Sequence, residues 1–83
     1  MALKLGLMAG YWGAMPPPDL VSVAKQAEAL GYWGYFTAEA WGSDAFTPLA
    51  WIGAQTKSIK LGTAIIQISA RTPTSAAMHA LTL

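Results

Sequence analysis

Apolar residues along the chain follow two spacings, which together predict three strands alternating with three helices. Residues 3–9 form an almost unbroken apolar run, typical of a strand that is buried on both faces of a parallel sheet. Residues 32–38 are rich in aromatic side chains and predict a second strand. Residues 59–68 are rich in β-branched side chains and predict the third and longest strand.

The segment between the first two strands predicts a helix. Its apolar positions recur at helical spacing, at Leu20, Val23, Ala24, Ala27 and Leu30. The side chain of Asp19 is suited to accept hydrogen bonds from the first free amides of this helix. Gly31 can adopt the left-handed conformation that ends a helix. We therefore expect a helix over residues 20–30.

The second and third helices are predicted by a threonine followed by proline, at Thr47 and Pro48 and again at Thr72 and Pro73. In the second helix, the residues expected to face the sheet are Leu49, Ile52, Gly53 and Thr56. The third helix is expected to run through Ala76, Ala77, Ala80 and Leu81. No stop signal follows the third helix before the last residue. We therefore expect this helix to be incomplete.

Strands and helices that alternate at intervals of about thirty residues predict parallel strands joined by crossover helices, an α/β fold. Such a run either curls into a (β/α)8 (TIM) barrel or reverses direction into a doubly wound sheet, and the pattern alone favours neither. An eight-unit barrel needs about 250 residues. The 83 residues therefore form, at most, the β-α-β-α-β-α start of an incomplete barrel, a single partial domain over residues 1–83.

Composition also indicates a partial structure. Hydrophobic residues make up 54% of the chain and charged residues 11%, whereas an ordinary soluble domain has about 25% charged residues. So much apolar surface on so short a chain needs cover from further polypeptide or from a partner. We expect either a fragment or an obligate assembler.

Charge and motifs exclude several function classes. The net charge is +1, with cationic residues dispersed along the sequence, so nucleic acid is not an expected partner. No apolar run reaches the roughly 18 residues that suggest a membrane span, and we expect a cytoplasmic protein. The sequence has no cysteine, no metal-ligand spacing, no phosphate-binding glycine loop and no nucleophile elbow.

Candidate chemistry lies in the loops that follow the strands, because reacting groups in parallel α/β folds gather at the carboxyl ends of strands. In the first loop, Gly10 and Gly13 permit the close approach of a flat ring. Tyr11 and Trp12 either stack on such a ring or cap the mouth of the barrel, and the residues favour neither role.

The second loop contains two carboxylates on either side of Trp41. Glu39, nearest the strand, is expected to point into a site, where it would hydrogen-bond a cofactor or act as an acid or base if burial raised its pKa. Asp44 is expected to face solvent or cap the next helix. His79 lies within the third helix, so we expect it at the surface or at an interface.

Four segments taken in order resemble the start of the luciferase-like monooxygenase superfamily. They are LKLGLM at residues 3–8, TAEAWGSD at 37–44, TPLAW at 47–51 and KLGTAI at 60–65. The resemblance covers the whole chain and is strongest to the branch that uses a deazaflavin, coenzyme F420, for hydride transfer. Bacterial luciferases use reduced FMN and oxygen, so FMN is the alternative cofactor. The fold that the resemblance implies is the TIM barrel.

The resemblance also implies roles for individual residues. Glu39 would be the acidic residue near the cofactor, in a catalytic role. The third strand would carry a bulge with a non-prolyl cis peptide bond between Ala64 and Ile65, against the cofactor ring. The remaining residues near the ring would be Gly10, Tyr11 and Gln67, and the substrate pocket would include Trp12 and Trp41.

The chain departs from the family's pattern in two respects. Many members follow the strand-two acid with histidine, whereas this chain has Ala40. The family's Asp-x-Leu-Ser-x-Gly-Arg segment and its phosphate-binding loops would lie beyond Leu83, so these residues alone should be inactive. We expect a full-length homo-oligomeric oxidoreductase that acts on a small organic substrate; the alternative is a non-catalytic α/β module that assembles with itself or a partner.

Overall fold

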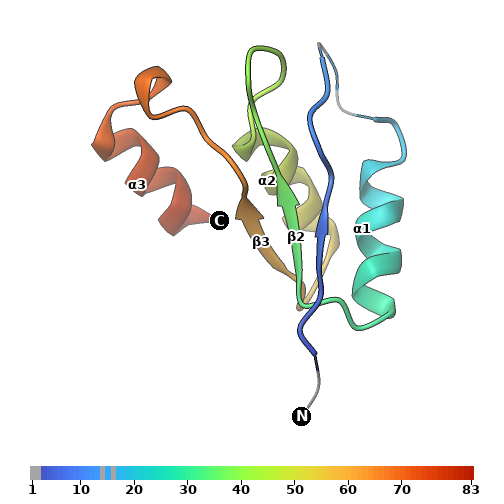
Figure 1. Ribbon diagram of the computed structural model, residues 1–83. Helices are drawn as coiled ribbons and strands as arrows, with labels where there is room; N and C mark the ends of the chain where they lie inside the picture. The colour runs from blue at the N-terminus through green and yellow to red at the C-terminus, as the bar shows by residue number, and fades with distance from the viewer. Residues whose placement is uncertain (1–2, 14, 16) are drawn as a thin grey trace.

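The computed structural model describes residues 3–13, 15 and 17–83 and contains a parallel three-stranded sheet (Figure 1). Its elements, in chain order, are β1 (Gly6–Met8), α1 (Leu20–Ala29), β2 (Gly34–Thr37), α2 (Phe46–Gln55), β3 (Lys60–Thr63), the short 3-10 helix η1 (Ile68–Ala70) and α3 (Pro73–Thr82). The number and order of strands and long helices agree with the sequence-based prediction. No described helix is long and apolar enough to cross a membrane.

The strands lie side by side in the order in which they occur in the chain, β1, β2, β3. Both pairs are parallel, with Tyr35 of β2 opposite Leu7 of β1 and Leu61 of β3. Helices α1 and α2 pack on each other and on one face of the sheet. A strand order without reversal and helices on a shared face are the features of a barrel start, and they confirm the predicted fold class. The sheet is open rather than closed.

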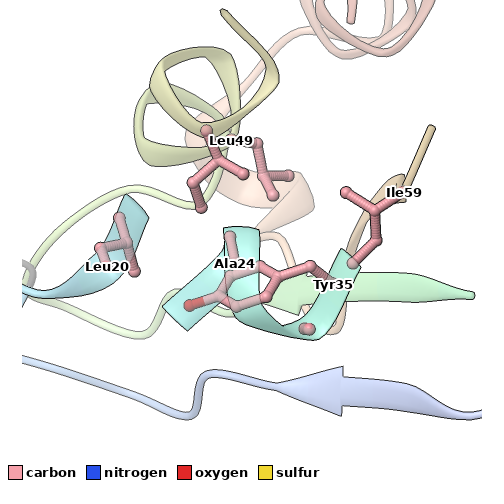
Figure 2. Close-up of a cluster of buried hydrophobic side chains, with 7 residues drawn as sticks. Leu20, Ala24, Tyr35, Leu49 and Ile59 are labelled. Carbon is pink, nitrogen blue, oxygen red and sulfur yellow. The ribbon is translucent and has the colours of Figure 1, made fainter. Parts of the chain in front are cut away.

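The core is a cluster of buried apolar side chains on the helix-covered face of the sheet (Figure 2). Its members are Leu20, Ala24, Ala27, Tyr35, Leu49, Ile52 and Ile59. The helical spacing in the sequence correctly predicted the α1 members. It was wrong at the end of the helix, where Leu30 is 77% exposed, because Leu30 lies one residue beyond the last helical residue.

Two of the three predicted capping or stop residues of α1 and α3 end or begin their helices as expected. Gly31 has a positive φ of 84° and ends α1 as expected. Thr72 accepts a hydrogen bond from the Ser75 amide (3.1 Å) and caps α3 as expected. Asp19 does not cap α1 with its side chain, so that prediction was wrong.

The N-terminus of α2 is capped by Asp44 rather than by Thr47. One Asp44 oxygen, Oδ1, accepts hydrogen bonds from the amides of Phe46 (2.9 Å) and Thr47 (2.8 Å). The helix consequently begins one residue before Thr47. Asp44 thus has the capping role that was one of its two expected roles, and the prediction of a Thr47 cap was wrong.

The third strand is shorter than predicted and ends in a bulge. β3 stops at Thr63, which pairs with Thr37. Continuing this register would bring the Glu39 amide to the carbonyl of Ala64, but the amide donates to Ile65 (3.0 Å). One extra residue on the β3 side defines a β-bulge. Apolar composition continues to residue 68, but the ladder does not.

The peptide bond between Ala64 and Ile65 is trans, and no described bond is cis. The expected bulge is therefore present, whereas the expectation of a cis bond was wrong. For a non-prolyl residue the trans form is favoured by about 2.5–4 kcal/mol.

On the face of the sheet opposite the core, the aromatic ring of Phe36 packs directly against glycine residues. A Cβ atom added at Gly6 or at Gly34 would lie 2.9 Å from Phe36 Cε2, and one added at Gly62 would lie 2.5 Å from Phe36 Cε1. Real Cβ atoms do not approach other heavy atoms so closely. The Phe36 ring therefore occupies the space of side chains that these glycines lack, one on each strand.

At the amino end of the strands, Glu28 joins α1 to the turn between α2 and β3. Its Oε2 atom accepts hydrogen bonds from three successive amides, those of Lys57 (2.8 Å), Ser58 (2.6 Å) and Ile59 (2.9 Å). The hydrogen bond from the Ser58 amide is the largest of the causes that lower the Glu28 pKa to about 2. This contact fixes the start of β3 relative to α1.

Candidate active site

The loops that follow the three strands meet at the carboxyl edge of the sheet. The Ser43 amide donates to the Gly13 carbonyl (2.9 Å) and joins the second loop to the first. The Gln67 amide donates to Glu39 Oε1 (2.8 Å) and joins the third loop to the second. The structure thus gathers most of the candidate residues at one edge, as the parallel α/β pattern predicts.

Glu39 lies at the centre of this edge and is only 8% exposed. Its Oε2 accepts a hydrogen bond from the Ala45 amide (2.8 Å), and its Oε1 accepts one from the Gln67 amide. The guanidinium of Arg71 binds both oxygens, with Nη2 2.8 Å from Oε2 and Nη1 in contact with Oε1. Four donors therefore surround one carboxylate.

The hydrogen bond from Arg71, followed by those from the Gln67 and Ala45 amides, lowers the pKa of Glu39 to about 2, against the opposing effect of burial. A role for Glu39 as a general acid requires a raised pKa. The pKa of Glu39 is shifted in the opposite direction, which keeps the side chain ionised. The donors also occupy the acceptor positions that a cofactor would need. In this arrangement the carboxylate is suited to hold loops together.

Arg71 is the site residue that the sequence analysis missed, because it was counted only as one of several dispersed cations. Its side chain is 12% exposed, and Nη2 lies 3.9 Å from Asp44 Oδ1. The guanidinium carbon lies 5.0 Å from the centre of the Phe46 ring. Hydrogen bonding to Glu39 raises the pKa of Arg71 above its ordinary value. A signal was available: Glu39 and Arg71 both follow strands that end at the same edge.

The bulge and its neighbours lie directly beside this ion pair. Ile65 is 60% exposed. The side-chain amide of Gln67 donates to the Ala40 carbonyl, so this side chain is bound to the second loop. Ala64 is exposed, and its amide donates to the Thr37 carbonyl (2.7 Å).

The aromatic residues of the first two loops have different surroundings. Trp12 is partly buried and packs against the core cluster, and its buried Nε1 has no hydrogen-bond partner among the described residues. Trp41 is 88% exposed, and Tyr11 is also exposed. Gly10 has a φ of 81°, which turns the chain at the start of the first loop.

The first and second loops touch at a pair of glycines. A Cβ atom added at Gly42 would lie 2.2 Å from the Gly13 carbonyl oxygen and 2.8 Å from that of Trp12. Only glycine at position 42 permits this approach. The two loops therefore form one continuous rim along the carboxyl edge of the sheet.

A hollow of about 230 Å³ lies between the second and third loops. It is lined by Glu39, Ala40, Trp41, Gly42, Ser43, Asp44, Gln67, Ala70 and Arg71. A larger hollow of about 820 Å³ lies between α2, β3 and α3. Because β3 is an edge strand of the described sheet, the larger hollow is the uncovered flank beside it, and the smaller one is the candidate site.

His79 is exposed on α3, as expected for a surface residue, with Nδ1 2.8 Å from the Ser75 carbonyl oxygen. Its ring stacks on Phe46, with the ring centres 5.1 Å apart. The described residues contain no group of three or more histidine, aspartate or glutamate side chains arranged to hold a metal ion.

Comparison with known proteins matches residues 4–83 to the family described as luciferase-like monooxygenase. The chain belongs to the luciferase-like monooxygenase family. It is also 59% identical, over 81 residues, to a Mycobacterium tuberculosis protein named as a proposed coenzyme F420-dependent oxidoreductase. The match covers 98% of this chain and 23% of that relative, so the chain spans about a quarter of the relative's length. No solved structure matches the chain.

Membership of the luciferase-like family raises the question of whether this edge suits a flat cofactor ring. The residues fit such a group in part. Tyr11, Trp41 and Ile65, one in each of the three loops, expose large apolar surfaces that a ring could cover. The loops around the hollow also carry Glu39 and Arg71, which are already bound to each other. Apolar contact is therefore the interaction that this portion of the family fold can offer.

Proposed function

We propose that a protein carrying this chain is an oxidoreductase that transfers hydride between coenzyme F420 and a small organic substrate, with FMN as the alternative cofactor. The observation that carries the proposal is the bulge between Ala64 and Ile65 at the carboxyl edge of a luciferase-like sheet, beside exposed apolar side chains. The name of the mycobacterial relative supports the choice of coenzyme F420.

In this proposal a bound deazaflavin or flavin supplies the hydride acceptor or donor. The chain's own residues bind and orient it: Tyr11, Trp41 and Ile65 cover its apolar surface and exclude water from it. Gly10 leaves room in the first loop for the ring. Glu39, held ionised, would keep the second and third loops together and would not donate a proton.

The complete protein is expected to have properties that this chain alone lacks. Because the chain spans 23% of the relative, we expect it to be inactive without further barrel strands, which supply the rest of the site. We expect the complete protein to be a cytoplasmic homo-oligomer that binds a small-molecule substrate.

The test uses the protein made from its complete coding sequence. Titration with coenzyme F420, and separately with FMN, is followed by tryptophan fluorescence and cofactor absorbance. Saturable binding of either cofactor supports the proposal, and the tighter ligand identifies the cofactor. The absence of binding by both rejects the proposal.

Two tryptophan variants test whether the cofactor binds at the candidate site or elsewhere on the surface. Trp41 and Trp51 are both exposed tryptophans, but Trp51 lies on α2. Trp41→Ala should weaken cofactor binding, whereas Trp51→Ala should leave it unchanged. Equal effects of the two substitutions would place the cofactor elsewhere.

A second candidate is a non-catalytic assembly module, favoured by apolar exposure on and near α3. Ile68 is 82% exposed and Leu81 86% exposed, and β3 has no neighbour on its outer edge within the described sheet. Unpaired edges and exposed apolar side chains promote association. Light scattering on the 83-residue chain tests this candidate. A folded, monodisperse monomer would exclude the module, and a defined oligomer would support it.

A further inference from the structure

We infer that Arg71 is the positioning residue of this site, holding the bulged segment in place by binding Glu39 rather than by touching the cofactor. The inference rests on the proposed function, because it gives the held segment a role in cofactor binding. It concerns a residue that neither the sequence pattern nor the family comparison identifies.

The chemistry of the Arg71 and Glu39 pair gives the contact a fixed direction. A guanidinium presents parallel N–H donors that match the two oxygens of a carboxylate, which gives both charge and direction to the contact. Arg71 binds both oxygens of Glu39 in this way. A lysine ammonium lacks the paired donors and would reproduce the charge but not the geometry.

Hydrogen bonds connect the segment after the bulge to the second loop. Residues 66–71 follow the bulge, and only local hydrogen bonds join Ala70 to Gln67 and Arg71 to Ile68. Among the described residues, every hydrogen bond from this segment to earlier parts of the chain ends on Glu39 or Ala40. Three of these four hydrogen bonds end on the Glu39 side chain, which therefore contributes most of the hydrogen bonding that positions the segment after the bulge.

Arg71 is itself in contact with residues at the N-terminal end of α2. Its guanidinium lies over Phe46 at 5.0 Å and within 3.9 Å of Asp44 Oδ1, and Asp44 caps α2. Residues at the N-terminal end of α2 thereby also orient the cation. Without Arg71, the nearly buried Glu39 carboxylate would lose its opposite charge, and an unpaired charge at such a position is strongly unfavourable.

The experiment uses the complete protein with the variants Arg71→Met, Arg71→Lys, Glu39→Gln and the double variant Glu39→Gln with Arg71→Met. Lys25→Met, on the exposed face of α1, is the control for loss of a cation. We expect Arg71→Met to raise the Kd for coenzyme F420 about tenfold, which is about 1.4 kcal/mol. Arg71→Lys should restore part of the affinity, and Lys25→Met should change nothing.

The double variant decides whether Arg71 acts through Glu39. If the two residues form one unit, the double variant should bind the cofactor no more weakly than the worse single variant. Losses that multiply would show that Arg71 contacts the cofactor independently, and would overturn the inference. A folded Arg71→Met protein with wild-type affinity would overturn it as well.

Hydrogen exchange without cofactor provides a readout that does not depend on the proposed function. Arg71→Met should accelerate exchange of the Gln67 and Glu39 amides while leaving the Tyr35 amide in the core unchanged. If the wild-type protein bound neither coenzyme F420 nor FMN, the proposed function would fail, and exchange would still test the positioning. Unchanged exchange at Gln67 would overturn the inference; if Arg71→Met does not fold, Arg71→Lys takes its place.

Discussion

The amide of Glu39 donates to the carbonyl oxygen of Ile65, one residue further along the chain than the register between β2 and β3 would bring it. This single offset turns Ile65 outwards at the carboxyl edge of the sheet, where it is 60% exposed. It also ends the regular ladder and begins the loop that returns to Glu39 through Gln67. The bulge and the carboxylate are thus two parts of one arrangement.

Replacing Glu39 with glutamine should remove a pH-dependent part of the stability. The folded-state pKa is lowered from 4.5 to about 2, so the stabilisation is fully present above the unfolded pKa and is lost as the pH falls through the folded pKa. Urea unfolding of the complete protein from about pH 6 to about pH 2 should show a smaller loss for Glu39→Gln than for wild type. Parallel curves for the two proteins would contradict this assignment.

Replacing Glu28 with glutamine should loosen the turn between α2 and β3. The carboxylate accepts three successive amide hydrogen bonds there, and a neutral amide oxygen accepts them more weakly. We expect faster hydrogen exchange at Ser58 and Ile59 at neutral pH, with little change at Glu39. Asp19→Asn is the matched control, because Asp19 is exposed and its side chain makes no capping hydrogen bond. Equal effects of the two substitutions would reject the anchoring role of Glu28.

Replacing Gly62 with alanine should destabilise the protein by about 1–3 kcal/mol, the cost of forcing an extra methyl group into a packed site. The new Cβ would lie 2.5 Å from Phe36 Cε1. Denaturant midpoints measure the effect, and Phe36→Leu in the same protein should recover part of it. Gly13→Ala is the control, since a Cβ there would meet no atom within 4 Å. An additive double variant would contradict the proposed contact.

Replacing Thr37 with valine should cost about 1–2 kcal/mol, because it preserves shape but leaves a buried carbonyl without its donor. The Thr37 hydroxyl is fully buried and donates to the Ala45 carbonyl (2.7 Å). Thr47→Val, at an exposed position in the first turn of α2, should have little effect. Thermal unfolding of both variants gives the comparison, and similar midpoints would contradict the prediction.

Local patterns predicted the elements well because their signals lie within a few residues. Gly31 ended α1 and Thr72 capped α3 as expected. The ion pair of Glu39 and Arg71 joins residues 32 positions apart, and no spacing rule reaches that far. It follows only from knowing that both strands end at the same edge. The end of β3 was predicted wrongly because composition reports apolar character, not register.

The sequence predicted the positions of the candidate site residues better than it predicted the residues and solvent around them. Glu39 was expected at the strand end, and its position there agrees, but its low pKa depends on donors from two later segments. Trp12 and Trp41 are the same residue type in neighbouring loops, yet one packs on the core and the other is exposed. Residue type alone gives no basis for that difference.

The contact between Gly42 and the Gly13 carbonyl has a consequence for the exchange of parts between relatives. A Cβ at position 42 would lie only 2.2 Å from that oxygen. The shapes of the two loops therefore depend on each other, although the two glycines are 29 positions apart in the chain. A graft that takes the second loop from a relative with any larger residue at that position would displace the first loop and, with it, Trp12. Redesign of ligand preference at this edge therefore has to transplant both loops together.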